Sequence, residues 1–107
     1  MIRLSIVPRA RANLFGLLVG KELELRRRKR GTLHRVGPKK RGREKWTHAS
    51  YPGWITLERR LDGSLAAAVH SRATDGGWQL LTSLIGFLHR HFHEAIASVT
   101  ISYDHPE

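Results

Sequence analysis

The chain has 107 residues, a formal net charge of +10, 40% hydrophobic residues and no cysteine. This length suits a single domain, residues 1–107, with a modest core, and the missing cysteines exclude disulfide frameworks and thiolate metal sites. The longest apolar run, residues 14–19, falls far short of the roughly 20 residues that cross a bilayer, and no leader pattern follows the first residue. The sequence therefore predicts a cytoplasmic protein with no membrane partner.

The first predicted elements are a strand and a short helix. Residues 2–6 alternate between apolar and polar side chains, which is typical of a half-buried strand, and Pro8 ends it because proline lacks an N–H. Residues 9–20 place leucines at helical spacing but include two glycines, so a short helix is favoured over a second strand. Residues 23–28 begin with leucines that alternate with glutamates and predict a strand.

A basic hairpin is predicted next. Residues 29–31 have the composition of a turn, and residues 32–36 predict a return strand, so residues 26–36 form a two-stranded arm. Residues 37–43 have no apolar period and contain two glycines, which indicates a mobile loop tip. The segment 26–45 therefore predicts a protruding basic arm.

The middle of the chain predicts antiparallel strands at residues 46–50 and 54–61, separated by a turn at 51–53. In the second strand, Ile55, Leu57 and Leu61 are expected to face one way.

The turn that follows sets the register. A two-residue turn at residues 62–63 would pair Leu57 with Ala68 and put the apolar residues of the two strands on opposite faces. An odd loop, residues 62–64, pairs Leu57 with Val69 and gathers the apolar residues on one face. We predict the odd loop.

The C-terminal third predicts a helix and a strand. Residues 73–77 form a linker in which Thr74 or Asp75 can cap the helix, residues 78–96 have an apolar stripe at helical spacing, and residues 99–103 alternate as a strand. The expected fold class is α+β, with an antiparallel sheet of about four to six strands packed on a long C-terminal amphipathic helix. A ferredoxin-like order with the basic hairpin protruding from it fits this sequence of elements.

The net charge is confined to the basic segment. Residues 26–45 hold eleven lysines and arginines and one glutamate, whereas the other 87 residues have eight basic and eight acidic side chains, which cancel. Like charges at this density must stay solvated, and arginine can bind a phosphate group with two hydrogen bonds. A nucleic acid or other polyanion is therefore the expected partner. It would be bound without strong sequence specificity, because phosphate contacts do not read bases. The predicted nucleic-acid-binding residues are Arg26, Arg27, Arg28, Arg30, Lys39, Lys40, Arg41, Arg43, Trp46 and Trp54.

Other interpretations of the segment stay open. A homo-oligomeric structural or interaction module could hold an acidic protein partner with it, or the segment could be a solvated loop without a dedicated partner. Trp46 and Trp54 follow the segment, where aromatic rings can stack on bases. Strand alternation puts Trp54 on the polar face, where it could instead cover a second layer or another subunit.

No catalytic signature is specific. Paired acidic residues and phosphate-binding loops are missing, so the chain is expected not to be an enzyme and to need no cofactor. A histidine-dependent RNase using His70 or His89 is the less favoured alternative. His89 and His93 are spaced i, i+4 and are weak candidate metal ligands that would need a third ligand, such as His70, Asp75 or His105, supplied by the fold.

The C-terminal helix also bears on assembly. Its apolar arc covers about 180°, whereas one sheet face normally needs little more than about 100°. The surplus must be covered by the short helix or by a second copy, and we expect a homodimer.

Overall fold

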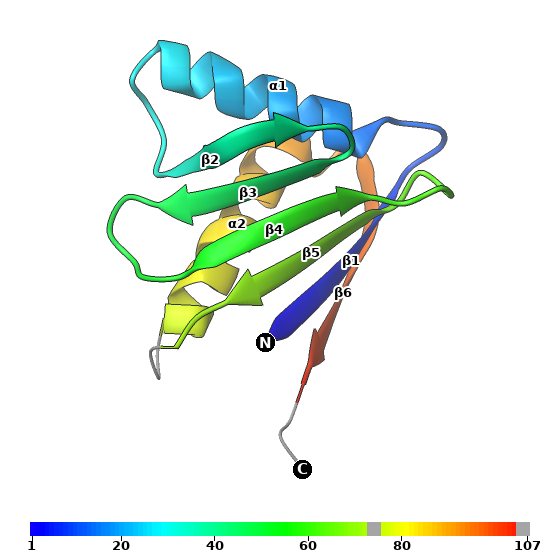
Figure 1. Ribbon diagram of the computed structural model, residues 1–107. Coiled ribbons are helices and arrows are strands. Elements are labelled where there is room, and N and C mark those ends of the chain that lie inside the picture. Colours follow the sequence, from blue (N-terminus) through cyan, green and yellow to red (C-terminus); the bar gives the residue numbers. More distant parts are fainter. Residues whose placement is uncertain (73–75, 105–107) are drawn as a thin grey trace.

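The described part of the protein forms one antiparallel sheet of six strands with two helices (Figure 1). The computed structural model describes residues 1–72 and 76–104, apart from the side chain of Lys39. The elements in chain order are β1 (Ile2–Pro8), α1 (Leu14–Arg27), β2 (Leu33–Lys40), β3 (Arg43–His48), β4 (Trp54–Arg59), β5 (Leu65–His70), α2 (Gly76–Phe92) and β6 (Ile96–Tyr103). Neighbouring strands follow the order β2-β3-β4-β5-β1-β6, and all five pairs are antiparallel.

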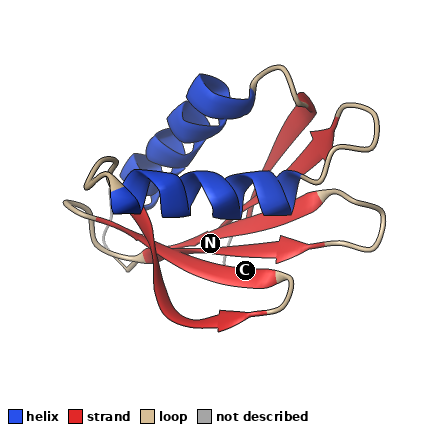
Figure 2. Ribbon diagram, turned by 90° about the horizontal axis from the view of Figure 1, so that it is seen from above, coloured by secondary structure: helices blue, strands red, loops and turns tan. Residues whose placement is uncertain are grey.

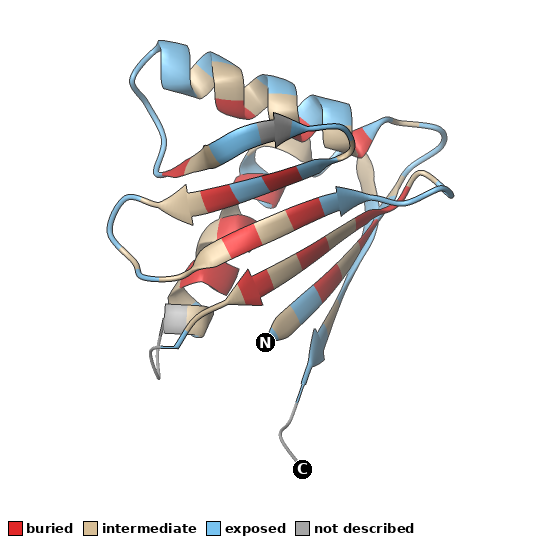
Figure 3. Cartoon of the chain, in the orientation of Figure 1, coloured by how far each residue is buried: buried red, intermediate tan, exposed pale blue. Residues whose placement is uncertain are grey.

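The core lies between the helices and one face of the sheet. Figure 2 shows both helices on the same side, and Figure 3 shows buried residues alternating with more exposed ones along the central strands. This period of two is what a sheet with only one covered face requires. Neither described helix is long and apolar enough to cross a bilayer. The buried apolar side chains include Leu4, Ile6, Leu14, Leu18, Trp46, Ile55, Leu57, Leu65, Val69, Leu80, Leu81, Leu84, Phe87 and Leu88.

Helix α1 corrects two predictions. The expected short helix at 9–20 and strand at 23–28 are one helix, Leu14–Arg27. Asn13 caps it, because its side-chain oxygen accepts a hydrogen bond from the Gly16 N–H over 3.1 Å. The strand prediction was wrong because a short alternation of leucine and glutamate fits a helix equally well once Glu22 is buried. Its carboxylate lies 3.1 Å from the His34 ring and 3.4 Å from the Arg26 guanidinium.

The structure also corrects the prediction of a protruding basic arm at residues 26–45. The hairpin of 26–36 and the mobile tip of 37–43 are replaced by β2 paired with β3, joined by Arg41 and Gly42. Gly42 makes the turn with a φ of 70°, a conformation that suits glycine. The basic segment is therefore divided between the end of α1 and the β2–β3 hairpin, which lie at opposite ends of β2 (Figure 1).

The β4–β5 hairpin confirms the gathering of apolar residues on one face but not the predicted register. Leu57 pairs with Ala67 rather than Val69, a shift of two residues. Asp62 accounts for the longer loop, because its carboxylate accepts hydrogen bonds from the Ser64 N–H (2.9 Å) and hydroxyl (2.6 Å). Leu61, expected to face the core with Ile55, is fully exposed in this loop.

Helix α2 is shorter than predicted and is not C-terminal. It ends at Phe92, and Ile96 already begins β6. The buried face is centred on Leu84. Of the predicted stripe, Leu81 and Leu88 are buried, whereas Trp78 is 62% exposed. The proposed caps, Thr74 and Asp75, lie outside the described residues. Four strands separate the two helices where a ferredoxin-like order has two, so that order is not confirmed.

The two strand tryptophans give a matched test of the core. Trp46→Ala should lower the free energy of unfolding by about 3–5 kcal/mol because it leaves a large cavity. Trp54→Ala, on the helix-free face, should cost about 1 kcal/mol, the value of a lost ring contact. Urea unfolding followed by circular dichroism measures both variants. Equal losses would show that Trp46 is not the core residue described above.

Candidate functional site

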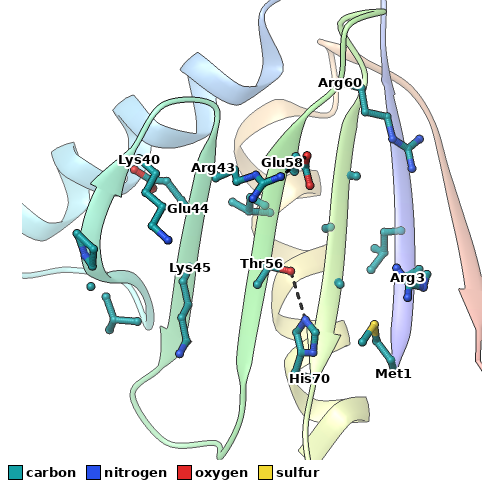
Figure 4. A pocket seen from close by; sticks show the side chains of 18 residues that line it. Met1, Arg3, Lys40, Arg43, Glu44, Lys45, Thr56, Glu58, Arg60 and His70 are labelled. Carbon is teal, nitrogen blue, oxygen red and sulfur yellow. Dashed lines mark hydrogen bonds and ion pairs between the residues drawn. The ribbon is translucent and has the colours of Figure 1, made fainter.

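A trough runs across the face of the sheet that carries no described helix. It encloses about 650 Å³ and is lined by residues from five neighbouring strands, β2 to β1. Figure 4 shows it from the open side, with α2 behind the sheet. Its floor includes Thr56 of β4 and the small side chains of Ala66 and Ala68 of β5.

The trough is hollow for two local reasons. Ala66 and Ala68 rise only one carbon above the sheet, whereas the longer side chains on either side form walls. At the β2 side, the pairing with β3 is irregular between Val36 and Lys40, and Gly37 has a φ of 76°. Such an irregularity bends a strand and increases its local twist, and the bent stretch lines one rim of the trough.

The walls carry more positive than negative side chains. Strand alternation turns Arg43 and Lys45 of β3 toward the trough while Trp46 points to the core. Two glutamates also line the site, but one lies 3.3 Å from Arg43 and the other, Glu44, accepts a hydrogen bond from Trp46. The lining cations are Arg3, Lys40, Arg43, Lys45 and Arg60.

An aromatic cluster lies at one end of the trough. The rings of Trp54 and His70 stack with centroids 5.0 Å apart and planes 10° from parallel. The Lys45 ammonium is 4.8 Å from the centroid of the Trp54 ring, within cation–π range. Thr56 Oγ1 lies 3.3 Å from His70 Nε2, so the imidazole is held by both a hydrogen bond and a stack.

His70 is set to be neutral in this environment. Burial lowers its pKa below the usual 6.5, and the positive charges of the terminal amino group, Arg3 and Lys45 lower it further. An anion bound in the trough would offset these positive charges. The arrangement can therefore hold a negatively charged group with fixed cations and gain a further positive charge when His70 is protonated.

The structure brings some of the predicted binding residues together and separates others. Lys40 and Arg43 line the trough, and Trp54 lies beside it, stacked on His70. Arg41 is exposed at the hairpin turn. Trp46 is 0% exposed and so has no free face for a base. The side chain of Lys39 lies outside the described residues.

The remaining predicted cations form a second group at the other end of β2. Arg26 and Arg27 are in the last turn of α1, where positive charge complements the helix dipole, and Arg28 caps it. Arg26 and Arg28 lie within 4 Å of the carboxylates of Glu22 and Glu24. Arg30 lines a smaller groove of about 340 Å³ between α1, β2 and α2. Half of this group therefore already has acidic partners.

Sequence reasoning missed part of the trough. Arg3 and Arg60 lie outside the basic segment in sequence, and only the strand order β3-β4-β5-β1 brings them to the same trough as Arg43 and Lys45. His70 was predicted only as a candidate RNase histidine or as a third metal ligand. Lys45 was counted in the segment but not selected. Its alternation with Trp46 was the signal that could have identified it as a residue of the exposed face.

The candidate metal ligands His89 and His93 do not form a set of three ligands among the described residues, and the nearby Glu94 carboxylate is 3.9 Å from His93 Nε2. The rings of His89 and His93 are 5.3 Å apart, but His93 Nδ1 lies 2.8 Å from the carbonyl oxygen of His89. No group of three or more potential ligands lies together within residues 1–72 and 76–104. The proposed third ligands Asp75 and His105 lie outside those ranges.

No protein-family model, curated protein or solved structure matches the chain. The trough, its charges and its aromatic cluster are therefore the features from which a function can be inferred.

Three histidines make stability depend on pH. Burial is the main cause that lowers the pKa of His48, His70 and His91 below 6.5. Below about pH 6.5 the unfolded chain takes up protons that the folded chain does not. The free energy of unfolding should therefore decrease as the pH is lowered through this range. Urea midpoints at about pH 7.5 and pH 5 measure this loss. His70→Asn should reduce this loss of stability at low pH. An equal loss in the variant and the unchanged protein would show that His70 does not contribute to the pH dependence.

Proposed function

We propose that this protein binds nucleic acid through the trough, mainly by contacts to phosphate groups. The observation that carries the proposal is the convergence of five cations on the helix-free face of the sheet, from β1, β2, β3 and the residue that follows β4. A core-forming sheet gains nothing from such convergence, because like charges repel and must remain solvated. An extended polyanion provides a counter-charge for each position along the trough.

The cations suit a phosphate backbone in both kind and spacing. Arginine can hold a phosphate with two parallel hydrogen bonds, and lysine adds a mobile point charge. Arg43 pairs with Glu58 and Arg3 pairs with Asp104, so three of the five lining cations have no ion pair to another described residue. These are Lys40, Lys45 and Arg60. Each neutralised phosphate contributes about −0.7 to −0.9 to the dependence of log affinity on log salt, so three unpaired cations give a slope of about −2 to −3.

The aromatic cluster adds a place for a base. Trp54 lies on the same face as the cations and is partly exposed. An unpaired base that displaces the Lys45 ammonium from the ring could stack there, at a gain of about 1–3 kcal/mol. Phosphate contacts and stacking read little sequence, so binding is expected to tolerate many sequences. Titration of labelled single-stranded RNA, single-stranded DNA and duplex DNA would rank the three forms.

One observation favours a second candidate function, cleavage of RNA. His70 lies within the phosphate-binding trough and is neutral near pH 7, the state that a general base requires. His70→Asn should then abolish turnover of RNA while keeping its binding. Binding without any turnover by the unchanged protein leaves His70 with a purely electrostatic and stacking role.

Matched charge variants test which cationic group binds. Lys40→Ser/Lys45→Ser removes two charges from the trough, and Arg27→Ser/Arg30→Ser removes two from the end of α1. Fluorescence anisotropy with labelled single-stranded RNA at several salt concentrations should show a loss of affinity of roughly tenfold or more for the trough variant. Its salt slope should also become about 2 units shallower.

The helix-end variant is the control and should change affinity much less. The opposite ranking would place the site at the helix end. Absence of binding by the unchanged protein at low salt would contradict the nucleic-acid proposal and favour an acidic protein partner.

A further inference from the structure

The two edges of the sheet differ in a way that concerns assembly. The edge strand β2 is blunted by Pro38, by the irregular pairing around Gly37 and by basic side chains such as Arg35 and Lys40. These are the devices that keep an edge from pairing with another chain. The opposite edge, β6, reads Ile-Ala-Ser-Val-Thr-Ile-Ser-Tyr and has neither a charged residue nor a proline.

The free hydrogen-bonding groups of β6 can be identified from its pairing with β1. The Asp104 N–H donates to the Met1 carbonyl over 3.1 Å, which continues the antiparallel register of Arg3 with Ser102 and Ser5 with Thr100. Hydrogen-bonded and non-hydrogen-bonded pairs alternate in such a ladder, so even-numbered residues direct their backbone groups at β1. The odd-numbered residues from Val99 to Tyr103 direct theirs at the outer edge, where no other described strand pairs with β6.

Apolar side chains accompany this edge on the helix side. Val99, Ile101 and Tyr103 share the face of Leu4 and Ile6 by register, yet Val99 is 38% and Tyr103 is 54% exposed. The strand therefore has one apolar face that α2 leaves partly uncovered.

Helix α2 adds to the same uncovered side. Its Ser83 and Arg90 line the groove beside β2, and Gly77 lies against Ile2 of β1. Trp78 and Ile85 are seven residues apart and so share one side of the helix. At about 100° per residue, this side lies on the other flank of the helix from Ser83 and Arg90. Both are among the exposed large apolar residues. The surplus apolar arc of this helix is therefore not covered by α1.

We propose that two copies of this chain join through β6, antiparallel and about a two-fold axis at Thr100. This register pairs Val99 of one copy with Ile101 of the other and uses the strand from Ala97 to Tyr103. It satisfies the free backbone groups of both edges and brings Val99, Ile101 and Tyr103 of the two copies onto one apolar face. A sheet of twelve strands results, six from each copy.

The charge distribution favours a second copy as the occupant. Each chain has a net charge of +10, so two copies repel wherever their basic segments approach each other. The basic hairpin lies at the β2 edge, and β6 is the opposite edge. Pairing through β6 therefore places the two basic edges at the far ends of the joint sheet, and the uncharged strand offers no contact that would select a charged partner. The two-fold axis is perpendicular to the sheet, so both troughs open on the same side.

Mass and cross-linking test the interface directly. Light scattering at about 100 µM protein, in about 0.5 M salt after nuclease treatment, should give twice the chain mass of 12.2 kDa. Because the chain has no cysteine, Thr100→Cys introduces a single thiol. The proposed register places the two Thr100 Cα atoms about 4.5 Å apart, within disulfide range, so oxidation should give a covalent dimer.

Ser98→Cys is the matched control on the same strand and face. Its two Cα atoms would be roughly 14 Å apart, given about 3.4 Å per residue, so it should not cross-link with itself. Monomer mass at this concentration overturns the proposal. A dimer in which Thr100→Cys fails to cross-link overturns it as well.

A charge variant provides an independent check. Val99→Lys places a lysine of each copy close to the two-fold axis, where the two positive charges repel each other. The measured mass should therefore return to that of one chain. Leu17→Lys adds the same charge at a residue of similar exposure on α1 and should leave the dimer intact. Circular dichroism establishes that both variants are folded. Persistence of the dimer in folded Val99→Lys contradicts the β6 interface.

Discussion

The burial of Trp46 is the interaction on which the rest of the arrangement depends. Its ring is 0% exposed, meets Phe87 of α2 edge-to-face at 5.2 Å and donates a 2.8 Å hydrogen bond to Glu44. Because β3 alternates, fixing this one side chain in the core forces Arg43 and Lys45 onto the opposite face. A shift of one residue would bury the cations and expose the tryptophan, so the core itself holds the basic hairpin in place.

This constraint explains why the sheet has one covered and one open face. Cations on the outer side of β3 cannot be covered by an apolar helix, because a buried unpaired charge costs several kcal/mol. Both helices therefore pack on the same side, and α1 carries its buried acid, Glu22, to where His34 and Arg26 can meet it. The small residues of β5 then leave the open face hollow rather than flat.

The sequence allowed prediction of features that depend on neighbours along the chain. The alternation of β1, the apolar face of the β4–β5 hairpin and the concentration of charge were all visible in local patterns. The strand expected at 23–28 failed because the alternation covered few residues and the partner of Glu22, His34, is twelve positions away. The trough could not be derived, because Arg3 joins Arg60 and Lys45 only through the order β3-β4-β5-β1. Its hydrogen bond network, such as Arg60 to Ser5 over 3.1 Å, crosses strands that are distant in sequence.

The distribution of charge over the fold also follows from these constraints. Eleven cations in twenty residues would repel strongly on a single protruding arm. Folding separates them instead, with β2 as a spacer between the end of α1 and the hairpin, and carboxylates of Glu22 and Glu24 beside part of the helix-end group. In the hairpin group Arg43 pairs with Glu58, and across the trough Arg3 pairs with Asp104. Ion pairs therefore relieve part of the repulsion at both ends of β2, and Lys40, Lys45 and Arg60 are the trough cations that have no ion pair to another described residue.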